Sequence, residues 1–244
     1  MDRLIPDPGA LGVPQADLII EAITERLDAK QGLYAALEPR MKPSAVLATN
    51  TSSLPLEQLS EGLARPERLV GIHFFNPVAL MQLVEVVRGS NTSDEIVDLA
   101  LAFVGRIGKL PLEVKSSPGF LVNRVLMAYL GEAMKLHQEG VPAELIDNLA
   151  EKIGMPMGPI ELSDTVGLDI CQAVAEEMIS AFGGESSDVL TKHIEKGNLG
   201  RKSGQGFYKW SKGKAVKSKV SASGHNSQEI SDRMLYMMLN ESVQ

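Results

Sequence analysis

A histidine and a glutamate near the middle of the chain have the residue types of a general-base pair. His73 lies near the end of one apolar segment, and Glu85 follows twelve residues later in another. If these segments are adjacent strands joined by a loop, the two side chains come within hydrogen-bonding reach, where a carboxylate orients an imidazole and stabilises its protonated form. On spacing alone, the simpler alternative of a core histidine beside an unrelated glutamate is favoured.

Apolar segments rich in β-branched residues alternate with segments of helical period in the first half of the chain. The predicted strands cover residues 16–23, 45–49, 68–75, 83–87 and 110–115. The predicted helices cover residues 25–37 and 55–63 and a third segment that a capping box at Thr92 and Glu95 opens. This alternation predicts an α/β fold with a parallel sheet and helices on its faces. Ligands bind at the carboxyl ends of the strands in such sheets, and this is where His73 would lie.

The pattern changes at Ser116–Gly119, which has the composition of a turn. From there to about Asn198 every segment has helical period. We therefore predict a partial α/β domain over residues 1–117 and an all-helical domain over residues 118–208. Residues 209–228 are rich in Lys, Ser and Gly, which indicates a linker.

The last segment, residues 229–244, matches an earlier helix. Four residues recur 109 positions further along the chain, and they are Arg124, Leu126, Leu130 and Glu132, repeated as Arg233, Leu235, Leu239 and Glu241. The match follows the predicted linker and carries the same apolar face, which favours the start of a second helical repeat. A chance match is the alternative.

The composition excludes several classes of protein. The net charge of -7 argues against a general nucleic-acid-binding protein. The single cysteine, Cys171, excludes an internal disulfide framework, and the 4 His have no short ligand spacing, so no metal site is predicted. No apolar run approaches the roughly 20 residues that a membrane span needs.

Five motifs occur in an order that resembles the 3-hydroxyacyl-CoA dehydrogenases of fatty-acid β-oxidation. They are Asn50–Leu54, His73–Pro77, Leu83–Val87, Ser117–Arg124 and Gly154–Pro159. The similarity extends from about Leu4 to Tyr208, and five ordered motifs are far more specific than any one of them. The resemblance implies an NAD-binding Rossmann-like domain over 1–117, a helical dehydrogenase C-terminal-type domain over 118–208, and oxidation of L-3-hydroxyacyl-CoA to 3-oxoacyl-CoA with NAD.

The resemblance also implies roles for particular residues. His73 and Glu85 match the catalytic pair of the family. The implied substrate-binding residues are Ser52, Asn76 and Asn123, and the implied cofactor-binding residues are Ala22, Glu25, Lys30 and Asn50. Helix capping is a simpler explanation for Ser52, and capping or packing within a helix is a simpler explanation for Asn123.

One element of the family pattern does not occur in the sequence, namely the G-x-G-x-x-G loop that holds the cofactor pyrophosphate at a helix N-terminus. The resemblance therefore implies a chain that begins near the third strand of the family, around Arg3–Pro6, with an incomplete Rossmann-like sheet and little activity of its own. A non-catalytic packing or interaction module is the alternative, and a related dehydrogenase for another hydroxy acid is a third.

The C-terminal repeat is typical of the multifunctional fatty-acid oxidation enzymes, and of their alpha subunit in particular. That likeness implies a cytoplasmic location, a thiolase partner, and an oligomer formed through the helical domain.

Overall fold

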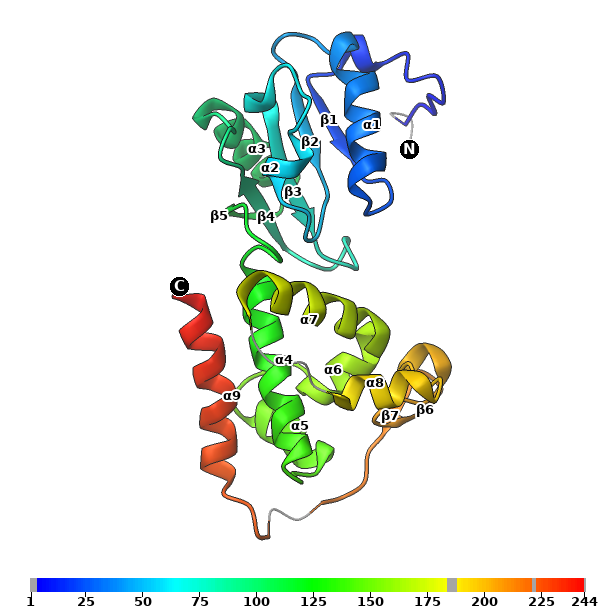
Figure 1. The fold of residues 1–244 in the computed structure, drawn as a ribbon, viewed down its shortest axis with the longest axis vertical. Helices are drawn as coiled ribbons and strands as arrows, with labels where there is room; N and C mark the ends of the chain where they lie inside the picture. Colours follow the sequence, from blue (N-terminus) through cyan, green and yellow to red (C-terminus); the bar gives the residue numbers. More distant parts are fainter. Residues whose placement is uncertain (1–3, 184–187, 221–222, 244) are drawn as a thin grey trace. The chain divides into compact units, whose positions relative to one another are not determined.

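The computed structural model describes residues 4–183, 188–220 and 223–243, and the chain divides into two compact units, Met1–Phe120 and Leu121–Gln244. The first unit contains a five-stranded sheet of order β1-β2-β3-β4-β5 (Figure 1). All five predicted strands are present, as β1 (Leu18–Glu21), β2 (Val46–Thr49), β3 (Leu69–Phe74), β4 (Leu83–Arg88) and β5 (Leu110–Lys115). Residues 4–6, where the resemblance implied a strand, form none, and Arg3 lies outside the described residues.

The sheet is mostly parallel, which confirms the α/β class and corrects one pairing. β1, β2 and β3 pair in parallel, as do β4 and β5, but β3 and β4 are antiparallel. The connection between β3 and β4, residues 75–82, is too short for the crossover that a parallel pair requires. This antiparallel pairing sets His73 directly opposite Glu85 in the ladder.

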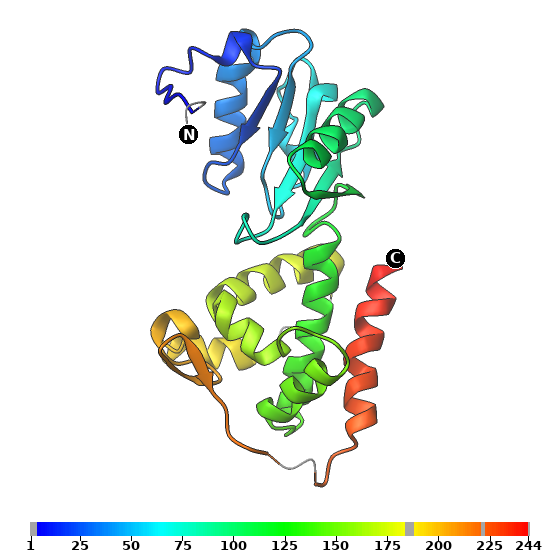
Figure 2. The same cartoon turned by 180° about the vertical axis from the view of Figure 1, so that it is seen from behind.

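The helices of the first unit lie on the two faces of the sheet. They are α1 (Leu27–Leu37), α2 (Leu56–Leu59) and α3 (Asp94–Arg106), with 3-10 turns at Val13–Gln15, Glu38–Arg40 and Pro66–Arg68. One side of α3 packs on alternate residues of the central strands, and α1 and α2 cover the opposite face (Figures 1 and 2). Because side chains alternate along a strand, His73 and Glu85 belong to the face that α1 and α2 cover.

The predicted capping box at the start of α3 is wrong by one position. Ser93 is the N-cap, and its side chain accepts a hydrogen bond from the backbone N–H of Ile96. Thr92 turns inward instead, where its hydroxyl donates to the carbonyl oxygen of Leu69 at 2.6 Å and accepts from the N–H of Gly89 at 3.0 Å. The buried carbonyl oxygen of Leu69 requires a hydrogen-bond donor, and this requirement outweighs the preference of Thr92 for the N-cap position.

The second unit is built from helices around a separate core. Its helices are α4 (Val122–Gln138), α5 (Ala143–Lys152), α6 (Pro159–Val166), α7 (Leu168–Phe182), α8 (Asp188–Glu195) and α9 (Ser227–Ser242), with a 3-10 turn at Arg201–Ser203. The core includes Tyr129, Ile146, Ile160 and Leu168, all less than 1% exposed. Within the described part of the chain, no helix has the length and apolarity required to cross a bilayer.

The predicted linker begins later than its composition indicated. Residues 209–216 form a hairpin of β6 (Lys209–Ser211) and β7 (Lys214–Val216). The buried carboxylate of Asp164 accepts hydrogen bonds from the N–H groups of Phe207 and Tyr208, both at 2.9 Å, and from the indole of Trp210 at 3.0 Å. These bonds hold the approach to the hairpin on α6. Residues 221 and 222 of the predicted linker lie outside the described residues.

Candidate active site

The His73 and Glu85 side chains are in contact within the first unit. Nδ1 of His73 lies 2.8 Å from Oε2 of Glu85, as the general-base hypothesis required, and both residues are buried, at 4% and 0% exposed. A carboxylate can only accept at this contact, so Nδ1 carries the hydrogen and Nε2 is the nitrogen with a free lone pair. Such a pair can take up a proton at Nε2 and share the resulting charge with Glu85.

Two aromatic rings lie against His73, and neither was identified from the sequence. The Phe75 ring centroid is 4.5 Å from that of the imidazole, and the Phe120 ring is 5.7 Å away in an edge-to-face arrangement. Phe120 is 1% exposed and has a φ of 50°, a left-handed conformation that costs an L residue about 1–3 kcal/mol. Both rings lie inside motifs that carry the resemblance, His73–Pro77 and Ser117–Arg124, but neither ring was given a role.

Gly71 allows β3 and β4 to approach closely beside the pair. It faces Val87 in the ladder, and a Cβ at this position would lie 2.6 Å from the Cβ of Val87 and 3.5 Å from Leu56 of α2. Because Gly71 is two residues before His73, it lies on the same face of the strand. The close packing at Gly71 therefore helps to fix the strand spacing that joins His73 to Glu85.

Asn50 connects the end of β2 to the end of β3. Its side-chain oxygen accepts a hydrogen bond from the N–H of Phe74 at 2.9 Å, and its own N–H donates to the carbonyl oxygen of Glu21 at 2.8 Å. The resemblance implied a cofactor contact for Asn50. The structure shows that its side-chain oxygen already braces the strand end next to His73.

A buried charged network lies under the carboxyl ends of β1 and β2. The Glu21 carboxylate accepts hydrogen bonds from Lys30 at 2.7 and 3.0 Å, from Tyr34 at 2.7 Å, from Thr49 at 2.8 Å and from the N–H of Ile23 at 2.6 Å. Burial by itself raises the pKa of Glu21, but these donors outweigh it and hold the pKa below its usual value. Glu21 had no predicted role, because the sequence shows it only as a single carboxylate at the end of an apolar run and does not show the donors that surround it.

Lys30 and Glu25 occupy different environments, although the resemblance gave both a cofactor contact. Lys30 is 0% exposed, and its amine lies between Glu21 and Oε2 of Glu25, the latter at 3.3 Å. The Glu25 side chain is 38% exposed. Its Oε1 accepts from the hydroxyl of Thr51 at 2.6 Å and from the N–H of Ser52 at 2.7 Å. In this structure Lys30 supports Glu25, and Glu25 holds the loop after β2.

The remaining predicted site residues lie at four places in the chain. Ser52 is exposed in the loop after β2, and Ala22 is exposed at the end of β1. Asn76 is exposed in the loop after β3, three residues beyond His73. Asn123 lies in the first turn of α4, in the second unit. The structure thus brings Ala22, Ser52 and Asn76 to one edge of the sheet, where strands β1, β2 and β3 end.

Comparison with known proteins identifies the class to which this fold and site belong. Residues 5–117 match the family model described as 3-hydroxyacyl-CoA dehydrogenase, NAD binding domain, and residues 119–210 match the 3-hydroxyacyl-CoA dehydrogenase, C-terminal domain. The chain belongs to the 3-hydroxyacyl-CoA dehydrogenase family, whose members are NAD-dependent enzymes.

Particular relatives cover different shares of their own length. A probable 3-hydroxybutyryl-CoA dehydrogenase of Deinococcus radiodurans is 45% identical over 80% of this chain and 72% of that protein. The fatty acid oxidation complex subunit alpha of Vibrio cholerae is 39% identical over 100% of this chain, which spans only 36% of that subunit. The crystal structure of 3-hydroxybutyryl-CoA dehydrogenase from Escherichia coli aligns with a TM-score of 0.84 and 40% identity, over 91% of this chain and 49% of that one.

Proposed function

We propose that this chain supplies the general base for NAD-dependent oxidation of L-3-hydroxyacyl-CoA to 3-oxoacyl-CoA. The observation that carries the proposal is the buried contact of 2.8 Å between His73 and Glu85 at the carboxyl edge of the sheet. Secondary alcohols do not lose their proton at neutral pH without a base, and an imidazole oriented by a carboxylate is suited to accept it.

The proposed chemistry assigns one task to each group. His73 takes the proton of the substrate 3-hydroxyl at Nε2 while the C3 hydride leaves, and Glu85 stabilises the imidazolium that forms. Bound NAD supplies the hydride acceptor. The Phe75 and Phe120 rings lie against the imidazole, and His73 and Glu85 are 4% and 0% exposed, so the attraction between the imidazolium and Glu85 is little screened.

The edge of the sheet has groups that suit the cofactor and the substrate. The half-exposed Glu25 carboxylate fits the hydroxyl groups of a ribose, since ionised carboxylates only accept hydrogen bonds. Exposed Ser52 and Asn76 offer donors, and Ala22 offers an uncharged surface beside them. Asn123 is proposed to orient the substrate carbonyl oxygen. The amine of Lys30 is buried, so Lys30 is proposed to position the Glu25 carboxylate and not to contact the cofactor itself.

The similarity to the alpha subunit of a fatty acid oxidation complex supports a place in β-oxidation beside a thiolase that consumes the 3-oxoacyl product. An oligomer formed through the helical unit belongs to the same proposal. The free thiol of Cys171 is compatible with a reducing compartment such as the cytoplasm.

The activity is tested on the natural protein that carries this chain, with whatever residues flank it. NADH formation is followed with L-3-hydroxybutyryl-CoA and, as the control, with its D enantiomer. Turnover of the L enantiomer alone is expected. Binding of either compound without any NADH formation would favour the non-catalytic alternative, and preference for a hydroxy acid that lacks CoA would favour a different dehydrogenase.

A further inference from the structure

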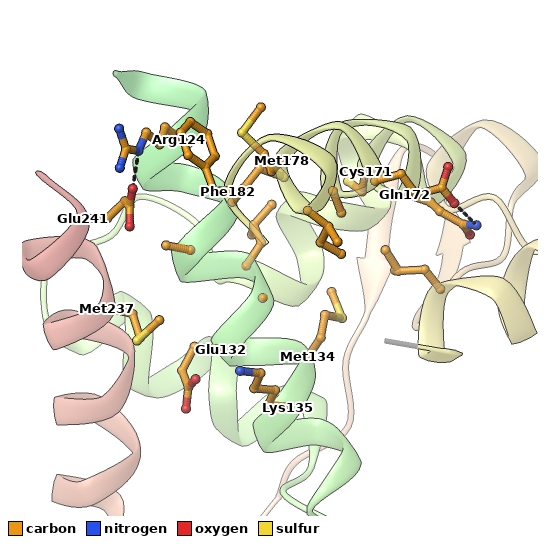
Figure 3. Close-up of a pocket in the computed structure, with 18 of the residues that line it drawn as sticks. Arg124, Glu132, Met134, Lys135, Cys171, Gln172, Met178, Phe182, Met237 and Glu241 are labelled. Atoms are coloured by element: carbon orange, nitrogen blue, oxygen red, sulfur yellow. Dashed lines mark hydrogen bonds and ion pairs between the residues drawn. The ribbon is translucent and has the colours of Figure 1, made fainter. Parts of the chain in front are cut away.

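A cavity of about 280 Å³ lies within the helical unit, between α4, α7, α8 and α9. Figure 3 shows the side chains of Met134, Met178 and Met237 around this space, one from each of α4, α7 and α9. Small-molecule sites in proteins have volumes of about 300–1,000 Å³, so the cavity has the size of a small ligand site. None of the predicted site residues is among the described residues that line the cavity, so the candidate active site does not account for it.

The inner wall of the cavity is apolar. It is formed by the buried side chains of Leu130, Met134, Met178 and Leu190. Cys171 also lines it, and burial raises the pKa of its thiol to about 11, so the thiol stays neutral at physiological pH. A charged group placed against this wall would lose its hydration without gaining a partner. The inner end of the cavity therefore suits an uncharged, apolar group.

The lining of the cavity can also adjust its shape. Several of its residues are methionines, whose unbranched and flexible side chains adapt to irregular ligands. They are Met127, Met134, Met178 and Met237. Phe182 and Met237 are 48% and 37% exposed although they line the cavity, so water contacts large apolar side chains at its mouth. A ligand that covers these side chains is stabilised by the hydrophobic effect.

The three carboxylates of the lining already have partners within the protein. They are Glu241 with Arg124, Glu132 with Arg233 at 2.6 Å, and Glu176 with the side-chain amide of Gln172 at 2.8 Å. Lys135 belongs to the same lining and is exposed. An exposed ammonium group has three donors and can bind an anion while it remains hydrated. The anionic end of a ligand is therefore expected at Lys135.

We propose that this cavity binds an unbranched monocarboxylic fatty acid, with the aliphatic chain among the methionines and the carboxylate beside Lys135. The chain matches the apolar inner wall, and the carboxylate matches the exposed ammonium group. A methylene group is about as large as a water molecule, whose share of liquid volume is roughly 30 Å³, so the cavity accommodates a chain of about eight to ten carbons. Binding at this site requires neither NAD nor His73.

The test is calorimetric titration of the 244-residue chain, without NAD, with hexanoate, octanoate and decanoate below their micelle-forming concentrations. The affinity should rise about fourfold for each added CH₂, the usual gain from burying a methylene group. Decanedioate should bind at least tenfold more weakly than decanoate, because its second carboxylate would lie against the apolar inner wall. No measurable binding, an affinity independent of chain length, or equal binding of decanoate and decanedioate would overturn the proposal.

A matched pair of variants on α7 locates the binding. Ala175 lines the cavity, so Ala175→Phe fills part of it and should weaken decanoate binding at least tenfold. Ala173 lies on the same helix but is exposed to solvent, so Ala173→Phe should leave the affinity unchanged. Lys135→Gln should weaken the binding of decanoate at least threefold and leave that of decanol unchanged. Equal effects of the two phenylalanine variants, or equal effects of Lys135→Gln on decanoate and decanol, would contradict the proposal.

The methionine methyl resonances of the unsubstituted chain cover the case in which the variants fail to fold. Decanoate should shift the resonances of Met134, Met178 and Met237, which line the cavity. The resonance of Met41, which belongs to the first unit, should not move. Unchanged resonances of the lining methionines, or shifts of equal size at Met41, would show that the fatty acid does not bind in this cavity.

Discussion

Removing the charge of Glu21 tests how much the buried network around this carboxylate contributes to the free energy of unfolding of the first unit. In the variant Glu21→Gln, the Lys30 amine stays 0% exposed and has only the Glu25 carboxylate, at 3.3 Å, as a charged partner. Breaking a buried ion pair from one side typically costs about 3–5 kcal/mol, because an uncompensated charge stays in the interior. Since the Glu25 carboxylate still partly neutralises Lys30, we expect the free energy of unfolding of the first unit to fall by about 3 kcal/mol, the lower end of this range.

Amide exchange over β2 reports the unfolding of the first unit without interference from the second. The control is Lys42→Met, which removes an ion pair of 2.7 Å with Asp17, whose side chain is 89% exposed. Because exposed ion pairs contribute little, the free energy of unfolding should fall by about 1 kcal/mol or less. The double variant Glu21→Gln/Lys30→Met should be more stable than the sum of its single changes predicts. A loss for Glu21→Gln no larger than that of the control would refute the reasoning.

The same network predicts the direction of a pH effect. Burial opposes ionisation of Glu21, but hydrogen bonds from Lys30, Tyr34 and Thr49 prevail and lower its pKa from 4.5. A carboxylate with a lowered folded-state pKa stabilises the fold fully above its unfolded value and loses this contribution as the pH falls through the folded value. The stability curves of the unsubstituted chain and Glu21→Gln should therefore converge below about pH 4.5. Parallel curves throughout the acid range would contradict this.

Three further changes have expected outcomes. Gly71→Ala should destabilise the first unit by about 1–3 kcal/mol in a urea titration, because its Cβ would lie 2.6 Å from that of Val87. Gly105→Ala in α3, where an added Cβ would have no atom within 4 Å, should be neutral or stabilising in the same titration, and equal losses for the two variants would contradict this. Asp164→Ala should release the Trp210 indole, held at 3.0 Å, and shift its fluorescence to the red; an unchanged spectrum would show that the bond is unimportant. With NAD and L-3-hydroxybutyryl-CoA, the 244-residue chain alone should have a turnover rate less than a tenth of that of a full-length relative. The reason is that its sequence has no G-x-G-x-x-G loop to hold the cofactor pyrophosphate. Equal turnover rates would contradict this.

Sequence periodicity was sufficient for the strands of the first unit because each is a short apolar segment bounded by turn residues. The β5 bounds were predicted without error, and β3 and β4 were within one residue at each end. The contact between His73 and Glu85 was predictable for the same reason, since two strands separated by a short loop pair side by side. Periodicity does not carry the direction of pairing. The length of the connection between β3 and β4 does, because it is too short for a parallel crossover, and the prediction of a parallel sheet overlooked it.

Features that depend on distant partners were not accessible from local patterns. Glu21 follows three consecutive apolar residues, and only the folded chain brings Lys30, Tyr34 and Thr49 around it. Phe120 lies 47 positions beyond His73 in the sequence, and only the turn before it brings the two rings together. The β6–β7 hairpin was missed because its Lys-, Ser- and Gly-rich composition is also typical of linkers.

The central claim is that His73 acts as the general base and Glu85 acts through it. The direct test is a double-mutant cycle on the natural protein, with kcat for L-3-hydroxybutyryl-CoA oxidation measured for His73→Gln, Glu85→Gln and the double variant. His73→Gln should lower kcat by roughly 10²–10⁴-fold. The double variant should be no slower than His73→Gln, since the effects of residues that act as a unit are not additive. Near-normal turnover by His73→Gln, or a double variant that is slower by the product of the two single effects, would contradict the account.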